Sequence, residues 1–321
     1  MQRVGTPWMR IVVAAAAVAL LLSLSLGTAA VAASDALGRM RVLVIRATWG
    51  PTPGDQTGLR AQLDESTAFF SRASFGKLDV AFDLTPWLHA YEDTAICPTR
   101  DDEEDERRSA LGPISTLARL AAASAGFDPF AYDRVVFLLP EPVCGLPGLG
   151  VRGEVLLANP SALSWPALVH ELGHTLGLAH ATSSTCARGC RVHEYGDTLS
   201  PMGRGIVDFS AFEKQQLGWL SGTVAASRSG SYAIGAVDAP TPLPQALIVR
   251  SARGEYWLEQ RSKPTRLVVR FVHRVDPRSP VRQSILLPAS PRKFSARGIF
   301  SARLTRVADD RAVLAVRFVR R

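Results

Sequence analysis

Residues 170–180 read His-Glu-Leu-Gly-His-Thr-Leu-Gly-Leu-Ala-His, and this stretch decides how the rest of the chain is interpreted. An α-helix turns about 100° per residue, so His170 and His174 lie on one face and can direct two imidazoles at one metal ion. His180 would face away on an uninterrupted helix, so it can join them only if the helix stops first. Gly177 permits that stop, because glycine adopts the left-handed conformation of a helix C-cap without steric cost.

The residue types in this stretch indicate a catalytic zinc site. Three imidazoles with one open coordination position are typical of catalytic zinc, whereas four protein ligands close a structural site. Glu171 follows the first histidine, where it can take a proton from metal-bound water. A bare HExxH occurs by chance in ordinary helices, but the added glycine and third histidine, with a Ser-Pro-Met-Gly turn at 200–203, leave little room for coincidence.

The motif HExxHxxGxxH followed by a methionine turn resembles that of the metzincin metallopeptidases. Three further segments are most similar to the gametolysin-like branch, and they are Ser-Trp-Pro at 164–166, Glu-Tyr-Gly-Asp at 194–197 and Leu-Gly-Trp-Leu at 217–220. The resemblance is firm from about residue 164 to 220 and weak over the last hundred residues. It implies one catalytic Zn²⁺ bound by His170, His174 and His180, with Glu171 as general base.

The resemblance also implies roles around the turn. Met202 is expected to form a sulfur-bearing floor beneath the histidines rather than to bind the metal. Glu194 or Asp197 is expected to accept a hydrogen bond from a ligand histidine, and the sequence does not choose between them. Some metzincins place a tyrosine two residues after the methionine to assist the oxyanion. Arg204 holds that position here, so either zinc alone or another donor such as Tyr195 must serve.

Residues 1–33 are predicted to be a cleavable export signal. Two arginines precede an apolar stretch at 11–26, and Ala-Val-Ala at 30–32 offers a small-x-small cleavage site. The alternative is an uncleaved membrane anchor, because the apolar stretch is nearly long enough to span a bilayer. We therefore expect a secreted protein.

Four cysteines are consistent with an oxidising compartment and allow three full pairings. We favour Cys186 with Cys190 and Cys97 with Cys144. The alternative is a second, structural metal held by Cys186, Cys190 and His193, but that set lacks a fourth ligand.

An acidic run at 101–106 is a candidate calcium site. It lacks the alternating oxygen spacing of a calcium loop, so we predict a solvated loop or helix start.

Net charge changes sign near residue 221. Residues 34–221 hold 16 Lys/Arg and 23 Asp/Glu, whereas residues 222–321 hold 19 and 6. The change supports a boundary between a peptidase domain at 34–221 and a basic domain at 222–321. The basic domain suits an anionic cell-wall or matrix polymer, with a solvated supporting surface as the alternative. No nucleic-acid motif is present, and oligomeric state is not indicated.

Residue patterns predict an α+β or α/β metzincin-like catalytic domain, a twisted sheet with an active-site helix, followed by a small all-β sandwich. Strands are expected at 41–46, 78–84, 134–139 and 153–159, with helices at 59–70 and 111–125. A helix at 209–220 precedes strands expected at 232–237, 246–250, 256–260, 267–273, 284–287 and 312–319. Ser164 is expected to cap the active-site helix.

Two segments before that helix also carry predictions. The glycine-rich stretch at 145–150 is predicted to be a loop. By the family resemblance, the strand at 153–159 borders the cleft and offers a free edge to a substrate chain.

Together these patterns predict a secreted zinc endopeptidase acting on extracellular, cell-wall or matrix proteins. One alternative is a catalytically weak or inactive matrix-binding protein on the same fold, and another is a zinc hydrolase of a non-peptide bond. The intact Glu171 argues against the first alternative, since lost catalysis places no demand on keeping that glutamate.

Overall fold

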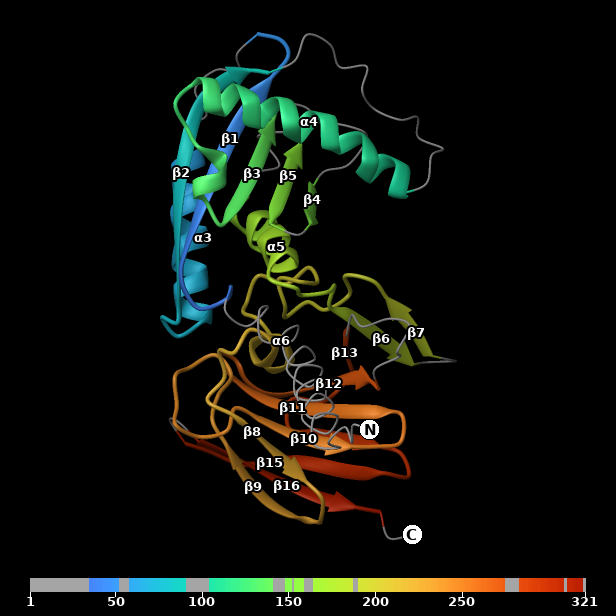
Figure 1. Cartoon of the computed structure of the whole chain (residues 1–321). Coiled ribbons are helices and arrows are strands. Elements are labelled where there is room, and N and C mark those ends of the chain that lie inside the picture. The colour runs from blue at the N-terminus through green and yellow to red at the C-terminus, as the bar shows by residue number, and fades with distance from the viewer. Residues whose placement is uncertain are drawn as a thin grey trace, which may run out of the picture.

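The computed structural model describes residues 35–51, 58–90, 104–140, 148–151, 153–158, 164–186, 190–274, 283–308 and 311–319. The helices are α3 (Leu59–Ala73), α4 (Glu104–Ser124), the 3-10 turn η1 (Pro129–Ala131), α5 (Trp165–Thr175) and α6 (Ala211–Gln216) (Figure 1). Among the described residues, none of the helices is both long enough and apolar enough to cross a membrane.

The strands fall into an N-terminal and a C-terminal set. The first set comprises β1 (Gly38–Thr48), β2 (Leu78–His89), β3 (Arg134–Leu139), β4 (Gly148–Val151), β5 (Glu154–Ala158), β6 (Thr182–Cys186) and β7 (Cys190–His193). The second set comprises β8 (Thr223–Ala226), β9 (Gly230–Ile234), β10 (Ala246–Arg250), β11 (Gly254–Ser262), β12 (Thr265–His273), β13 (Ser284–Leu286), β14 (Lys293–Ala296), β15 (Phe300–Ala308) and β16 (Arg311–Phe318).

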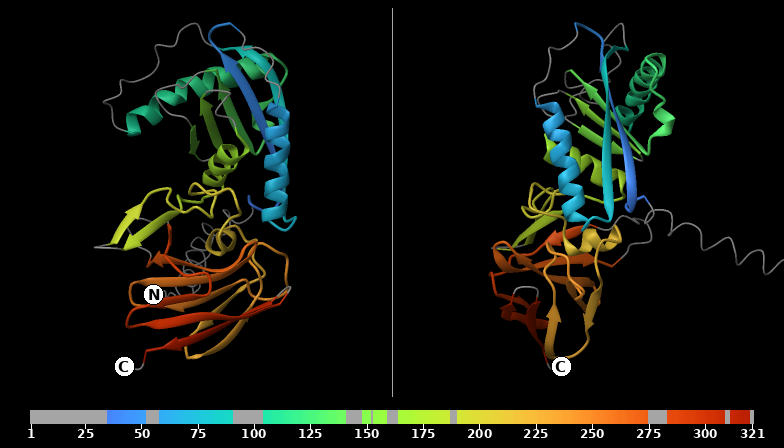
Figure 2. Two further views of the ribbon diagram at one scale, coloured as in Figure 1. Left: turned by 180° about the vertical axis from the view of Figure 1, so that it is seen from behind. Right: turned by 90° about the vertical axis from the view of Figure 1, so that its left-hand side faces the viewer.

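The first sheet forms the central layer of the N-terminal half. Its order is β2-β1-β3-β5-β4, with β4 antiparallel to β5 and the other neighbours parallel. Every residue of β3 is buried, as expected for a parallel strand covered on both faces. One apolar core packs α3 and α5 against one face, and a second packs α4 against the other (Figure 2).

Two predictions for this sheet are wrong. β5 has no free edge, because it pairs with β3 on one side and with β4 on the other. Part of the predicted glycine-rich loop forms β4, which is the edge strand among the described strands. Glycine weakens a strand but does not prevent one, and the ladder to β5 supplies the hydrogen bonds. β4 lies beside α5, so β4, and not β5, is the edge strand next to the active-site helix.

The C-terminal half consists of two further sheets packed face to face. A seven-stranded sheet has the order β7-β6-β13-β12-β11-β10-β8, and a four-stranded sheet has the order β14-β15-β16-β9. Alternate residues of both sheets fill a common apolar core, for example Val249 and Leu258 on one side and Leu304 and Leu314 on the other. The prediction of a mixed α/β part followed by a β part is confirmed.

The seven-stranded sheet extends across the boundary predicted at residue 221. β6 and β7 come from the segment that follows α5, and β6 pairs in parallel with β13 from near the C-terminus. The two halves therefore share one sheet.

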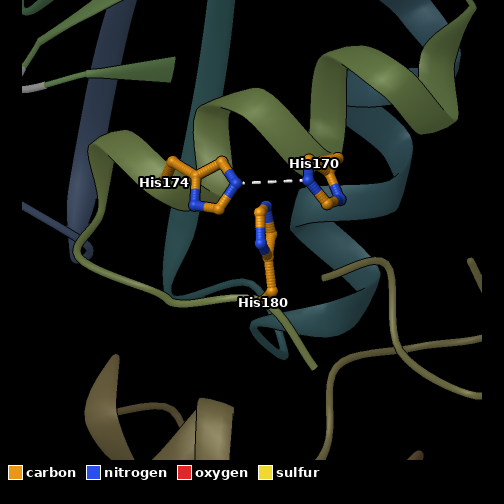
Figure 3. A group of neighbouring side chains, drawn as sticks. All are labelled: His170, His174 and His180. Atoms are coloured by element: carbon orange, nitrogen blue, oxygen red, sulfur yellow. Dashed lines mark hydrogen bonds between the residues drawn. The ribbon is translucent and has the colours of Figure 1, made fainter. Parts of the chain in front are cut away.

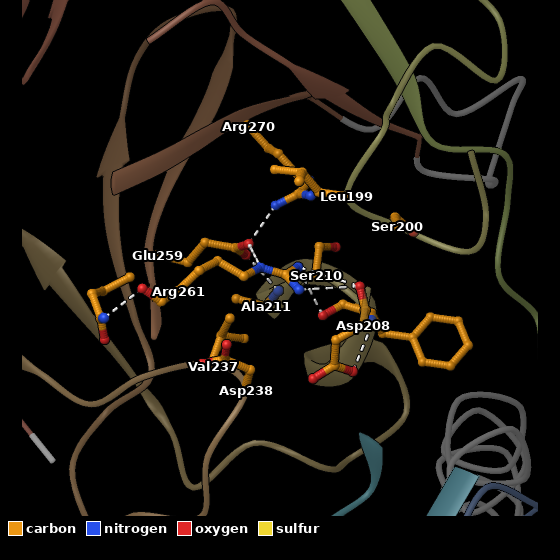
Figure 4. Close-up of polar contacts among 12 residues, drawn as sticks. Leu199, Ser200, Asp208, Ser210, Ala211, Val237, Asp238, Glu259, Arg261 and Arg270 are labelled. Carbon is orange, nitrogen blue, oxygen red and sulfur yellow. Dashed lines mark hydrogen bonds and ion pairs between the residues drawn. The ribbon is translucent and has the colours of Figure 1, made fainter. Parts of the chain in front are cut away.

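A buried network of charged groups also joins the halves (Figure 4). Arg270 of β12 donates through Nε to Asp197 Oδ2 at 2.8 Å. Its Nη1 donates to Glu259 Oε1 at 2.5 Å. Arg261 of β11 contacts Glu259 at 3.0 Å and the carbonyl of Asp208 at 3.3 Å. Asp197 and Asp208 belong to the segment between β7 and α6, so the C-terminal strands hold that segment in place.

Candidate metal centre

α5 presents two histidines one turn apart and ends where the sequence predicts. The Leu178 N–H donates to the Gly173 carbonyl at 3.1 Å and the Gly177 N–H donates to the His174 carbonyl at 3.0 Å. These two bonds form a Schellman end, and Gly177 has the left-handed φ of +90° that this end requires. The chain therefore turns back toward α5 and carries His180 with it.

The start of α5 differs from the prediction. The Ser164 side chain makes no capping hydrogen bond, although its carbonyl accepts the Leu168 N–H at 3.0 Å. The Trp165 N–H instead donates to Gln62 Oε1 of α3 at 2.8 Å. A side chain from another helix thus satisfies the N–H of the first helical residue.

Three imidazoles converge after this turn (Figure 3). The Nε2 atoms of His170 and His174 lie 3.1 Å apart, and one ring nitrogen from each of His170, His174 and His180 lies within 4.8 Å of the others. Nitrogen ligands about 2.0–2.1 Å from a tetrahedral zinc ion lie roughly 3.3 Å apart. The spacing and the all-imidazole donor set therefore fit zinc.

An oxygen atom lies within hydrogen-bond distance of each Nδ1. The Nδ1–H of His170 donates to the Pro201 carbonyl at 2.7 Å, and that of His174 donates to the Leu178 carbonyl at 2.9 Å. His180 Nδ1 lies 3.0 Å from Glu194 Oε1. These bonds place the proton on Nδ1 and leave each Nε2 lone pair for a metal.

Of the two carboxylates between which the sequence left the choice open, Glu194 contacts a histidine. Asp197 instead accepts the Leu199 N–H at 2.8 Å and pairs with Arg270.

Burial lowers the pKa of His170 more than its hydrogen bond to Pro201 raises it, so this ring stays neutral, as a metal ligand must.

Met202 is fully buried and its sulfur lies against α5. Its carbonyl accepts the Ala181 N–H at 2.8 Å, which ties the turn to the segment that carries His180. A Cβ on Gly173 of α5 would lie 2.4 Å from Met202 Sδ, so the glycine allows the sulfur to approach the helix. The Met202 N–H donates to Ser200 Oγ at 3.1 Å, which fixes the turn from the other side.

A pocket of about 280 Å³ opens beside His170 and Glu171. Apolar residues form much of its wall, and Arg204 contributes a cation. The full lining is Leu157, Pro166, Ala167, His170, Glu171, Pro201, Gly203, Arg204, Gly205 and Ile206. The Tyr195 ring lies outside this lining, 4.0 Å from the His180 ring between centroids.

The predicted cysteine pairs and the acidic run lie only partly within the described residues. Cys97, Cys144 and residues 101–103 of the acidic run lie outside the described residues. Residues 104–106 begin α4. The backbones of Cys186 and Cys190 are cross-strand partners of β6 and β7, but their side chains lie outside the described part, so the disulfide stays a prediction. His193 Nε2 lies 3.0 Å from Thr185 Oγ1.

Residues 109–250 match the family model described as gametolysin peptidase M11. The matched region is similar to that of gametolysin-like metallopeptidases. The match includes α5, all three converging histidines and Met202, and it extends into the C-terminal half as far as β10. None of the curated proteins matches the chain significantly.

Similarity of this region to the gametolysin-like metallopeptidases implies a metal, typically zinc, at the three histidines. The gametolysin-like match also ends well beyond residue 221, which agrees with the sheet that the two halves share.

Gly177→Ala tests the turn that brings His180 to the site. A β-carbon in the left-handed conformation costs about 1–2 kcal/mol, so we expect lower stability and weaker zinc binding. Gly112→Ala is the matched control, because Gly112 is an exposed helical residue without positive φ. That change should be neutral or stabilising by about 1 kcal/mol. Urea unfolding and zinc titration of both variants measure the difference, and equal effects would argue against a special role for Gly177.

Proposed function

We propose that this chain is a secreted zinc endopeptidase in which Glu171 is the general base. The observation that supports this most is the convergence of three imidazole rings, with His170 and Glu171 lining the adjacent pocket. Zinc, when bound, supplies a Lewis acid for the scissile carbonyl and lowers the pKa of a coordinated water to about 7.

The residues of the chain divide the remaining work. Glu171 takes the proton of the attacking water and passes it to the leaving amine. Glu194 and the carbonyls of Pro201 and Leu178 hold the three rings in the tautomer that metal binding needs. The ring of Tyr195 lies beside the histidines, which supports it as a candidate donor to the oxyanion. Arg204 lines the pocket, where it is proposed to influence which peptides are cleaved.

A substrate chain is proposed to pair with β4. This strand is the edge of its sheet and lies beside α5. An extended peptide that adds to an edge strand passes along the site, which suits cleavage within a chain. Extracellular, cell-wall or matrix proteins are the proposed substrates, in keeping with the predicted signal at 1–33.

The test is hydrolysis of an unfolded protein by the purified full chain. We expect cleavage that a chelator abolishes and zinc restores, with one zinc per chain by elemental analysis. Cleavage that survives removal of all metal would refute the proposal. A zinc-loaded chain that hydrolyses esters or glycans but no peptide would favour the non-peptide alternative.

Arg204 gives the pocket a predicted preference. Arg204 lines the pocket, and no carboxylate of the described residues forms an ion pair with it. We expect faster cleavage where a residue flanking the scissile bond is Asp or Glu. Arg204→Glu should invert that preference, with kcat/KM for acidic peptides falling about 10- to 100-fold because like charges then meet. Cleavage-site mapping on a peptide library measures this, with Arg204→Lys as the control that keeps the charge.

A further inference from the structure

The outer face of the four-stranded sheet holds a second, larger hollow. A groove of about 670 Å³ crosses β14, β15 and β16. Its lining comprises Lys293, Phe294, Ser295, Ser301, Ala302, Arg303, Thr305, Ala315 and Arg317. In Figure 1, β15 and β16 lie at the far end of the C-terminal half, with α6 and β11 between them and α5, so this groove is separate from the metal centre.

Strand alternation explains the shape of the groove. Ala302, Leu304 and Leu314 point into the core between the two sheets, so their neighbours along β15 and β16 face outward. Ser295 pairs with Ser301, and Arg303 pairs with Ala315. Short side chains form the floor of the groove, while the long side chains of Lys293, Arg303 and Arg317 rise from three neighbouring strands.

The charges in the groove work against the stability of the sheet. Lys293 lies directly opposite Arg303 in the antiparallel ladder, and like charges in that position destabilise a sheet. No residue of the groove lining is acidic, and the described residues from 283 to 319 contain no Asp or Glu. Folding does not account for this cluster of cations, whereas an anionic ligand would neutralise it.

We propose that this groove binds an acidic polysaccharide, with sulfate or carboxylate groups paired to Lys293, Arg303 and Arg317. The hydroxyls of Ser295 and Ser301 can exchange hydrogen bonds with the hydroxyls of a sugar. The ligand would hold the enzyme on a matrix while the metal centre stays open to substrate. That consequence rests on the proposed peptidase function, but the binding itself does not.

Two other polyanions fit the groove less well. Single-stranded nucleic acid is bound by stacking bases on aromatic rings, and the aromatic residue here, Phe294, packs against Tyr256 and Phe300. An anionic membrane is bound by a polar face with exposed apolar side chains beside it. None of the exposed large hydrophobic residues of the described chain lines the groove.

The experiment compares two triple variants of the full chain that lose the same charge. K293Q/R303Q/R317Q removes the cations of the groove. R297Q/R306Q/R311Q removes three exposed arginines, in the β14–β15 turn, β15 and β16, that do not line it. Binding to heparin and to polygalacturonate is measured at about physiological salt, with dextran as the uncharged polymer.

We expect the groove variant to lose about 10- to 100-fold in affinity and the other variant to stay within about threefold of the wild type. The salt dependence should also become shallower in the groove variant. An equal loss in both variants, or no retention of the wild type on either acidic polymer, would overturn the proposal. Tighter binding to single-stranded DNA or to phosphatidylserine vesicles would overturn the ligand class.

Two measurements keep the binding result separate from other causes. Thermal unfolding shows whether each variant is folded, and the charge-preserving K293R/R303K/R317K should bind like the wild type. Cleavage of a short soluble peptide should be equal in all of them. Absence of peptide cleavage by the wild type would count against the proposed peptidase function. Polysaccharide binding would still test the proposed role of the groove.

Discussion

Glu171→Gln is expected to leave a folded, zinc-binding protein that cleaves peptide bonds about 10⁴-fold more slowly. General acid–base catalysis contributes about 10²- to 10⁴-fold, and the proposed role uses Glu171 in both proton transfers. The glutamine amide keeps the size of the side chain but does not accept a proton near neutral pH. The measurements are kcat/KM on a fluorogenic peptide and zinc affinity by competition with a chelator.

Glu194→Gln is the matched control for that experiment. Glu194 lies 3.0 Å from Nδ1 of His180 and is absent from the pocket lining. Its loss should weaken zinc binding about 10- to 100-fold, as changes in outer-shell partners do, with activity largely recovered at saturating zinc. If Glu171→Gln retained wild-type turnover, or lost zinc as Glu194→Gln does, the assignment of the base would be wrong.

The second large effect is expected from Arg270→Met. Arg270 is fully buried and bonded to the carboxylates of Asp197 and Glu259. Its removal leaves two buried carboxylates without that cation, and breaking such a pair costs about 3–5 kcal/mol. Urea unfolding monitored by circular dichroism measures the loss. Arg250→Met removes an exposed arginine paired with Glu255 and should change stability little.

The same substitution should reach the metal centre. The carbonyl of Asp197 accepts the Arg204 N–H at 3.0 Å and its N–H donates to the Ala181 carbonyl at 3.3 Å, so Asp197 connects the turn around Met202 with the segment after His180. We therefore expect weaker zinc binding in Arg270→Met even at temperatures where it is folded. Arg270→Met/Asp197→Asn removes one of the stranded charges and should recover part of the stability. Equal stability of the two single variants at Arg250 and Arg270 would contradict this account.

The contribution of Arg270 to stability also depends on pH. Burial alone would raise the pKa of Glu259, but the guanidinium groups of Arg270 and Arg261 hold it below its ordinary value. A carboxylate with a depressed pKa contributes stability at pH values above its unfolded pKa and loses that contribution as pH falls. The gap between the wild type and Arg270→Met should therefore narrow in acid.

Sequence patterns predicted the parts of the site that depend on spacing. The four-residue step from His170 to His174 and the stop at Gly177 are local properties, and both occur as expected. The acceptors for His170 and His174 are backbone carbonyls, which every sequence carries, so no residue type could reveal them. The choice of Glu194 over Asp197 depends on Arg270, which lies 73 residues after Asp197.

The fold was predicted best where strands are apolar runs. β1 and β3 were found for this reason, whereas β4 was missed because Gly-Leu-Gly-Val resembles a loop. β15 was also missed. It alternates apolar and polar residues, but its serines and arginines weaken the apolar signal. Arg270 could have been found, since a single charge within Leu-Val-Val-Arg-Phe-Val is a signal of a buried partner.

β6 begins two residues after His180 and pairs on one side with β13, about a hundred residues later. During synthesis, this pairing cannot form until the ribosome has released almost the entire polypeptide. A nascent chain stalled before residue 284 would hold all three histidines but would lack the β13 strand beside the third. The metal centre of a newly made molecule should therefore reach its final rigidity only as translation nears its end.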